Sequence, residues 1–231
     1  MHFTTVHMLI EAVMNKEFSS ILQSADLNFP DGMPLVWLGR RAGNGAVSRV
    51  CGPEFMPAFC KQTAHLGYRH FFYGGAPGSA EAVIEALKRE SPDIQIAGHY
   101  TPPYRPLNAE EDREICARIN QSEADLVWVC LGCPAQEKWI HEHRDRLNAP
   151  VLLAVGAAFD FVAGRAQRAP KFLRENGLEW LYRLAKDPRR LWRRYLVYNA
   201  FFLYLLLKQA YKAEDLQVAE EALPMERKLS A

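Results

Sequence analysis

The sequence lacks several features that would assign it to common protein classes. Its 231 residues include five cysteines, which are too few for a disulfide scaffold, and an odd number suits a reducing compartment. The first twenty residues have no basic stretch followed by an apolar one, so no signal peptide is expected. No 18-residue stretch is uniformly apolar, which argues against a membrane-spanning helix. We therefore expect a cytoplasmic protein that is soluble or peripheral to a membrane.

Motifs for metal and nucleotide binding are also scarce. The chain has no Asp-x-Asp pair of the kind that often holds the divalent ion of a nucleoside diphosphate. His141 and His143 are two positions apart, which places them on different faces of a helix. Neither a G-x-G-x-x-G motif nor a P-loop is present. We therefore expect no metal and no other cofactor.

The overall composition is close to the globular average, with 49% hydrophobic and 24% charged residues, but the charge is unevenly spread. Residues 165–212 contain 12 Lys or Arg against 3 Asp or Glu, whereas the whole chain has a net charge of +1. The remainder of the chain is therefore net acidic. A basic segment of this kind predicts an anionic partner for the C-terminal part: nucleic acid, lipid headgroups or a diphosphate.

Short apolar runs alternate with helical patterns through the middle of the chain, which is typical of parallel βαβ units. In the helical pattern that begins at Ser79, apolar residues recur at i, i+3, i+4 and i+7. We expect strands at 47–50, 70–73, 94–100, 126–131 and 151–155. We expect helices at 53–66, 79–90, 110–121 and 136–147. These elements predict an α/β fold, with a Rossmann-like parallel sheet and helices on both of its faces.

The C-terminal part follows a different pattern. After Gly164 the expected strands stop, and a basic, aromatic-rich helical region is expected from residue 178 to about 211. We divide the chain into a Rossmann-like domain at 1–176, a basic helical appendage at 177–213 and a polar, frayed tail at 214–231. At the other end, residues 3–10 begin almost directly in a strand or helix pattern, which is expected if the chain starts late or a first element is missing.

Two strand-to-helix junctions give the clearest signals for ligand binding. Gly74 and Gly75 follow one expected strand, and Gly132 follows another, with Gln136 and Glu137 opening the next helix. Glycines at such a junction let a ligand approach the backbone, and the helix N-terminus attracts an anion. A tight turn alone would need the same glycines. Because parallel strands share a carboxyl edge, the two junctions together predict a nucleotide cleft.

Two pairs of side chains near these junctions have alternative interpretations. Cys130 and Cys133 form a C-x-x-C spacing, which leaves a redox function open. Because Cys130 lies within the apolar strand itself, a packing role is favoured. Asp31 lies in a rigid turn between two prolines, and Asp160 lies among apolar residues after the last strand. Each is either a structural residue or a positioned carboxylate.

Arginines and aromatic residues interleave in the basic region. Arginine binds phosphate through paired N–H groups, so several arginines together can replace the charge of a metal. Trp192, Tyr195 and the aliphatic run 205–207 follow the first arginines, a combination typical of a helix that lies on anionic lipid. A docked helix that closes the core is the alternative interpretation, and the aliphatic run makes nucleic-acid binding the less favoured one.

From about Thr4 to Leu207 the chain resembles the WecG/TagA/CpsF glycosyltransferases (glycosyltransferase family 26) in the order and spacing of several segments. The matching segments are ADLNFPDGMPLVW (25–37), RVCGPEF (49–55), FFYGGAPG (71–78), YTPPYRP (100–106), ADLVWVCLGCPAQEKW (124–139), VGAAFDFVAG (155–164), RAP (168–170) and GLEWLYRLAKDPRRLWRRY (177–195).

The resemblance implies an inverting glycosyltransferase with a Rossmann-like fold (GT-E type). Such an enzyme moves a sugar from a UDP-sugar to a polyprenyl-diphosphate-linked acceptor in teichoic acid, common antigen or exopolysaccharide assembly. The appendage would engage an anionic membrane surface, at the inner face of the cytoplasmic membrane. We expect UDP-sugar as a co-substrate, no metal and no nucleic-acid partner, and a homo-oligomer is left open.

The resemblance also assigns roles to residues. It implies that Asp31 is the catalytic base and that the Thr before the first helix, taken as Thr4, lies beside the substrate. A single aspartate suffices for inverting transfer, because one base removes the acceptor proton as UDP departs. The expected substrate-binding residues are Gly74, Gly75, Gly132, Gln136, Glu137, Asp160, Arg168, Arg183, Arg190 and Arg194.

Two positions depart from the family pattern. The Thr-x-Asn pattern typical near the N-terminus reads Thr4-Thr5-Val6-His7, and the Lys of the P-K-Q-E motif is Ala135. The alternative function is a non-catalytic nucleotide-sugar-binding or membrane-docking module on the same fold.

Overall fold

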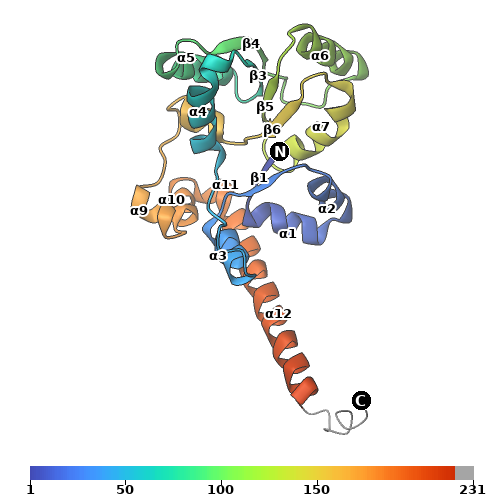
Figure 1. Ribbon diagram of the computed structural model, residues 1–231, viewed down its shortest axis with the longest axis vertical. Helices are drawn as coiled ribbons and strands as arrows, with labels where there is room; N and C mark the ends of the chain where they lie inside the picture. The colour runs from blue at the N-terminus through green and yellow to red at the C-terminus, as the bar shows by residue number, and fades with distance from the viewer. Residues whose placement is uncertain (222–231) are drawn as a thin grey trace.

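A single parallel sheet organises the molecule (Figure 1). The computed structural model describes the backbone of residues 1–221 and the side chains through residue 209. The strands are β1 His2–Thr4, β2 Asn28–Pro30, β3 Arg69–Gly74, β4 Gln95–Tyr100, β5 Leu126–Cys130 and β6 Val151–Ala154. They pair in the order β2-β1-β6-β5-β3-β4, and every pairing is parallel.

Helices occupy most of the remaining described chain. The α-helices are α1 Val6–Met14, α2 Lys16–Gln23, α3 Met33–Arg41, α4 Gly52–Thr63, α5 Ser79–Glu90, α6 Ala109–Gln121, α7 Ala135–His143, α8 Ala158–Val162, α9 Lys171–Glu175, α10 Glu179–Lys186, α11 Pro188–Trp192 and α12 Tyr198–Glu221. Two short 3₁₀ turns are η1 Ala64–Leu66 and η2 Arg144–Arg146, and η3 Arg193–Val197 is a π-helix.

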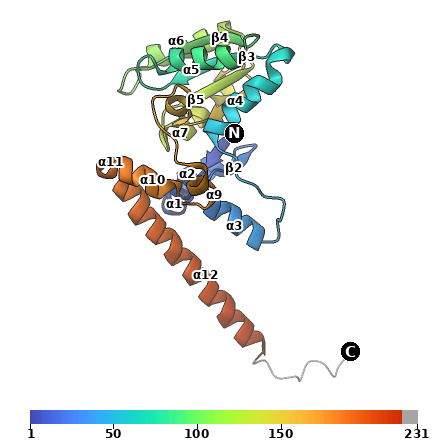
Figure 2. The same ribbon diagram turned by 90° about the vertical axis from the view of Figure 1, so that its left-hand side faces the viewer.

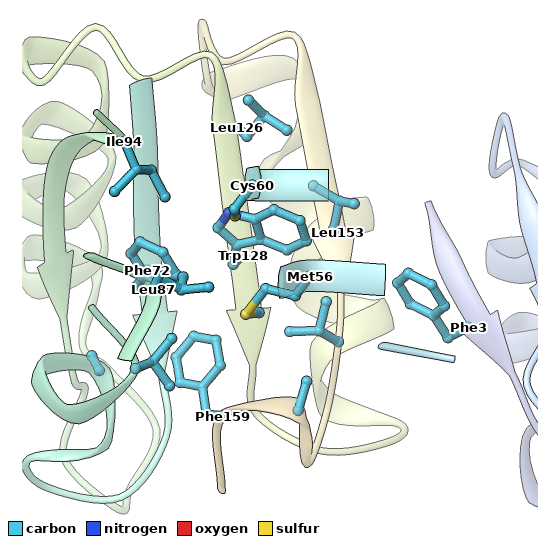
Figure 3. Packing of buried hydrophobic residues seen from close by; sticks show 14 residues of the cluster. Phe3, Met56, Cys60, Phe72, Leu87, Ile94, Leu126, Trp128, Leu153 and Phe159 are labelled. Carbon is cyan, nitrogen blue, oxygen red and sulfur yellow. The ribbon is translucent and has the colours of Figure 1, made fainter. Parts of the chain in front are cut away.

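Helices cover both faces of the sheet, because the strands are apolar on both sides. Successive residues of a strand point to opposite faces. Phe72 and Trp128 therefore pack against α4, α5 and α8, whereas Phe71 and Val127 pack against α6 and α7. Figure 3 shows the first of these clusters, with Trp128 at its centre. The predicted α/β fold with helices on both faces is confirmed.

Four of the five expected strands are present as β3, β4, β5 and β6, but the strand expected at 47–50 is wrong. This segment is an extended loop that makes one backbone hydrogen bond to β2, from Val50 to Pro30. The next carbonyl along, that of Asp31, accepts a hydrogen bond from the Arg49 side chain instead. Because β2 ends at Pro30 and the chain enters α3 at Met33, no longer ladder of backbone hydrogen bonds forms beside this segment.

Most of the elements that the sequence did not predict lie before residue 42, and the short helices α8 and α9 were also missed. Both β1 and β2 have only three residues, too few to show a periodic pattern, and α3 follows a stretch interpreted as a turn. The sheet nevertheless gains β1 as its second strand, where it pairs with β2 and β6. Residues 3–10 thus form most of β1 and the first part of α1.

The C-terminal region is helical, as expected, but it is divided into several pieces. Asp187 and Pro188 separate α10 from α11, and the π-helix joins α11 to α12. The long α12 projects away from the sheet in both views (Figures 1 and 2). It continues through Glu221, past the expected boundary at residue 214, and residues 222–231 of the expected tail lie outside the described residues. The division into domains stays a prediction.

The first turns of α12 pack against α1 and α3. Phe202 is buried with Val6 and Ile10 of α1, and Leu38 of α3 packs against the same cluster. The Tyr198 hydroxyl donates a 2.5 Å hydrogen bond to Glu11. The appendage is therefore fixed to the N-terminal helices. Among the described residues, no helix combines the length and the apolar character needed to cross a bilayer.

Candidate active site

A cavity of about 1380 Å³ lies at the carboxyl edge of the sheet. Residues at or just after the end of every strand line it: 5–8, 31–34, 75–78, 101–104, 130–133 and 155–158. The appendage supplies the opposite wall through α10, α11, η3 and α12. Pockets for one small ligand usually measure about 300–1,000 Å³. The cavity therefore has room for more than one ligand group.

The cavity includes the point where the strand connections diverge. From β3 the chain passes through α5 to β4, whereas from the adjacent β5 it passes through α7 on the other face to β6. Ligands of open parallel sheets bind at such a point. Gly74 ends β3 there with φ of +100°, and a Cβ on it would lie 2.3 Å from the Cys130 carbonyl oxygen. Gly74 is thus required by packing and lies outside the cavity lining, whereas Gly75 and Gly132 line it.

Asp31 lies directly after β2, where its N–H donates a 2.8 Å hydrogen bond to the Thr4 carbonyl and so continues the strand pairing. Its side chain lines the cavity. Burial raises the pKa of Asp31 to about 7, although the Arg49 guanidinium beside it acts in the opposite direction. A carboxylate with that pKa can exchange a proton near neutral pH.

Arg49 and Glu179 complete the surroundings of Asp31, and neither was among the residues expected at the site. An Arg49 Nη2 lies 2.7 Å from a Glu179 oxygen and 3.5 Å from Asp31 Oδ1. Arg49 lies in one of the segments that resemble the family, which was the available signal. Glu179 of α10 lies in another of these segments, 177–195, but no local pattern pointed to its contact with Asp31.

Gln136 and Glu137 occupy the start of α7, but only Gln136 reaches the cavity. Gln136 is buried, and its Oε1 accepts the Gly156 N–H at 3.0 Å while its Nε2 donates to Glu137 at 2.8 Å. Gln136 therefore ties the β5 and β6 junctions together. Glu137 is fully buried behind it, and burial raises its pKa to about 7.

At the N-terminal end of the site, the structure places Thr5 where Thr4 was expected. Thr5 is the residue directly before α1; its Oγ1 accepts the Met8 N–H, and it lines the cavity. The Thr4 side chain instead contacts Asn28 of β2 at 3.4 Å and does not line the cavity. With Thr5 as the threonine, His7 takes the position of the asparagine in Thr-x-Asn. His7 also lines the cavity, and burial and then the Arg194 charge lower its pKa to about 4.

Arginine dominates the charge of the cavity. Eight arginines line it against four carboxylates, a balance that suits a ligand with several negative charges. All four arginines expected at the site are among the eight: Arg168, Arg183, Arg190 and Arg194.

The four expected arginines differ in their partners. Arg168 pairs with Glu54 at 2.9 Å, and Arg190 pairs with Asp187 at 2.5 Å. Arg183 lies over the Phe161 ring at 5.6 Å. The Arg194 Nε is buried and has no hydrogen-bond partner among the described residues. The remaining expected residue, Asp160, lies in the first turn of α8 and lines the cavity.

The two cysteines of the C-x-x-C spacing also line the cavity. Burial raises the pKa of Cys130 to about 12 and raises that of Cys133 as well. Both thiols therefore stay protonated at neutral pH, where thiol redox chemistry needs a thiolate. These pKa shifts favour the packing role.

Among the described residues, Asp112, Cys116 and His143 form a group that could hold a metal ion, with ligand atoms within 4.8 Å of one another. The group lies between α6 and α7, outside the cavity lining. Asp112 already pairs with His143 at 2.7 Å and with Arg146 at 2.6 Å. The guanidinium at this distance opposes a cation, so the group carries no metal assignment.

Known proteins similar to this chain identify its family. Residues 1–216 match the Glycosyl transferase WecG/TagA/CpsF family. The chain belongs to this family. The resemblance inferred from the sequence is thereby confirmed, and with it the general assignment as a glycosyltransferase.

Two curated relatives in the WecG/TagA/CpsF family carry the same name, N-acetylglucosaminyldiphosphoundecaprenol N-acetyl-beta-D-mannosaminyltransferase. The protein from Bacillus spizizenii is 37% identical over 186 residues, which cover 80% of this chain and 70% of the relative. The protein from Bacillus subtilis is 31% identical over 202 residues, which cover 87% and 76% respectively.

Proposed function

We propose that this glycosyltransferase moves a sugar from a UDP-sugar to a polyprenyl-diphosphate-linked glycan acceptor with inversion, and that Asp31 is the general base. The observation that carries the proposal is a partly buried carboxylate in an arginine-lined cavity at the carboxyl edge of the sheet. The names of the relatives supply a first substrate pair: an N-acetylmannosaminyl donor and an N-acetylglucosaminyl-diphosphoundecaprenol acceptor.

Asp31 has the properties that an inverting transfer requires. The base must accept the proton of the acceptor hydroxyl while the bond between the anomeric carbon and UDP breaks. Because burial raises the pKa of Asp31 to about 7, its carboxylate is a stronger base than an exposed aspartate. The hydroxyl oxygen then attacks the face of the sugar opposite to UDP, and UDP leaves with the bonding electron pair.

The leaving UDP gains negative charge that the protein must stabilise. Arg183 and Arg194 extend from the appendage into the cavity and are suited to the diphosphate, because arginine binds phosphate oxygens through paired N–H groups. Fixed cations in a partly closed cavity stabilise developing charge strongly. We therefore propose that transfer needs no metal.

The appendage also has the composition of a membrane-contacting surface. Large apolar side chains are exposed along it, including Trp192, Leu203 and Leu207, with Arg189 and Arg193 nearby in the chain. Apolar and cationic side chains together bind anionic lipid. We propose that this surface holds the enzyme peripherally on the inner face of the cytoplasmic membrane, at the depth of the acceptor diphosphate.

The proposed function is tested by incubating the full chain with a panel of UDP-sugars and an N-acetylglucosaminyl-diphosphate-polyprenyl acceptor, and measuring product mass. We expect one added N-acetylhexosamine from the preferred donor, with the anomeric configuration inverted. Saturable binding of UDP-sugar without any transfer would instead support a non-catalytic binding module.

A further inference from the structure

Arg49 lies between two carboxylates that come from opposite ends of the chain. Its Nη2 donates a 2.7 Å hydrogen bond to Glu179, the first residue of α10. The same nitrogen lies 3.5 Å from Asp31 Oδ1, and Nε donates a 3.2 Å hydrogen bond to the Asp31 carbonyl oxygen. One guanidinium therefore contacts the backbone of Asp31 and faces its side chain, while its short side-chain hydrogen bond goes to Glu179.

The way in which Arg49 divides its contacts between Asp31 and Glu179 affects how well the Asp31 carboxylate can act as a base. A close, paired contact with arginine would occupy the carboxylate oxygens and stabilise the charged form, which weakens the carboxylate as a base. The 3.5 Å separation keeps the favourable charge nearby and leaves the Asp31 oxygens open to another donor.

We propose that Glu179 is a positioning residue of the transfer reaction: it holds the Arg49 guanidinium, so that the Asp31 carboxylate remains available for the acceptor hydroxyl. This inference rests on the proposed function, in which Asp31 is the base. Glu179 acts through Arg49 and needs no contact with either substrate.

The position of Glu179 depends on how the appendage docks. Gly177 precedes α10 with φ of +72°, and a Cβ on it would lie 2.9 Å from the Trp37 ring and 3.2 Å from the Met33 side chain of α3. The chain therefore approaches α3 closely just before Glu179. Docking of the appendage on α3 thus brings an anion to Arg49 and adjusts the base on the sheet edge.

The groups around Asp31 set the direction of the expected effect. Arg49 and Cys51 face it from the loop before α4, and Glu179 and Arg183 face it from α10. Glu179 raises the pKa of Asp31, whereas Arg49 and Arg183 lower it, against the larger effect of burial. Loss of the Glu179 charge removes one raising influence and releases Arg49 to pair with Asp31. Both changes lower the pKa of Asp31.

The test uses the full chain and compares Glu179→Gln with Glu175→Gln. Glu175 is a matched control, because it carries the same charge on neighbouring α9, pairs with exposed Lys171 at 3.6 Å and lies outside the cavity. Two quantities are measured between pH 5 and 9: kcat for sugar transfer, and the ¹³C carboxyl shift of Asp31, assigned with Asp31→Asn. Thermal melting of each variant reports whether it is folded.

In Glu179→Gln we expect the acidic limb of kcat and the Asp31 titration both to move down by about one pH unit, with KM for UDP-sugar unchanged. Glu175→Gln should match the wild type, and Glu179→Asp, which keeps the charge, should lie closer to the wild type than Glu179→Gln. An Asp31 titration that is the same in folded Glu179→Gln and wild type would overturn the inference. If Glu179→Gln does not fold, Glu179→Asp is used instead, and an Asp31 pKa in that variant above the wild-type value would also overturn the inference. A wild type that transfers no sugar overturns the proposed function instead, and the carboxyl titration still decides the role of Glu179.

Discussion

The sheet and the appendage differ in how far their large apolar side chains are exposed. In the sheet, Trp128 and Phe72 are 0% exposed. In the appendage, Trp192, Leu203 and Leu207 are 52%, 58% and 71% exposed. The sheet therefore completes its own core, whereas the appendage presents apolar surface outward, as an interaction surface does. In the proposed function, the sheet edge supplies the base and the appendage supplies the contact with lipid, and the two regions can be tested separately.

The largest effect is expected from Asp31→Asn. Turnover should fall by about 10²–10⁴ because the acceptor hydroxyl loses its general base, while the affinities for UDP-sugar and for liposomes stay unchanged. Above pH 7 the variant should also melt at a higher temperature than the wild type, because it no longer buries a charge whose pKa burial has raised. Initial rates, UDP-sugar titration and thermal melting at pH 8 check these outcomes. Full turnover in the variant would contradict the role of Asp31.

Changing the exposed apolar side chains of the appendage should have the opposite effect to Asp31→Asn: liposome binding should weaken. Replacing Trp192, Leu196 and Leu207, which are exposed and lie outside the cavity lining, together with serine should weaken binding to anionic liposomes by about 10²-fold, because buried apolar side chains contribute to membrane affinity. UDP-sugar binding should not change. Cosedimentation with vesicles of phosphatidylglycerol and phosphatidylcholine measures the effect.

A control for this variant comes from exposed apolar residues outside the appendage. Val13, Met14 and Leu27 are 54%, 61% and 43% exposed. Their triple replacement by serine should leave vesicle binding as in the wild type. Equal losses in the two triple variants would remove the special role of the appendage.

A pair of leucine truncations compares the two regions in stability. Leu153 is 1% exposed in β6, and Leu207 is 71% exposed in α12. Leu153→Ala should lower the free energy of unfolding by about 2–5 kcal/mol, because it leaves a cavity in the core. Leu207→Ala should change it by less than about 0.5 kcal/mol. Urea denaturation measures both, and equal losses would show that Leu207 serves the packing of the protein itself.

The smallest effects are expected from a chelator and from Cys133→Ala. Arginines replace a metal in the proposed transfer, so excess EDTA should leave the initial rate unchanged. If the rate fell to zero in EDTA and returned with magnesium, metal-independent transfer would be refuted. Cys133→Ala should keep most of the transfer activity, because the Cys133 thiol stays protonated at neutral pH. Loss of activity in that variant would reopen a role for the thiol.

The sequence predicted the parts of the molecule in which a local pattern determines the outcome. Strands β3, β5 and β6 are apolar runs covered on both faces, and the helix that begins at Ser79 has a clear apolar stripe. The three-residue strands β1 and β2 were missed because pairing with the rest of the sheet, rather than composition, holds them in place. Pairing also explains the error at 47–50, where β2 ends at Pro30 and leaves one backbone hydrogen bond between the two segments.

The place of Gln136 was predictable because its motif follows a recognisable strand, whereas Asp31 was singled out by the resemblance of the segment 25–37 to the family. The candidate site was not predictable where distant segments meet. The contact between Arg49 and Glu179 joins residues 130 positions apart, so no local pattern could reveal it. The choice between Thr4 and Thr5 depended on where β1 ends and α1 begins, a boundary that only the fold determines.

The pH dependence of kcat tests the central claim most directly. A base whose pKa is raised to about 7 must be deprotonated to act, so kcat should rise with pH through a single ionisation near pH 7 and then level off. The measurement uses saturating UDP-sugar and acceptor, with Asp31→Asn in parallel. We predict that the ionisation near pH 7 is present in the wild type and missing from the residual activity of the variant. A wild-type kcat that is constant from pH 5 to 9, or an unchanged limb in Asp31→Asn, would contradict Asp31 as the general base.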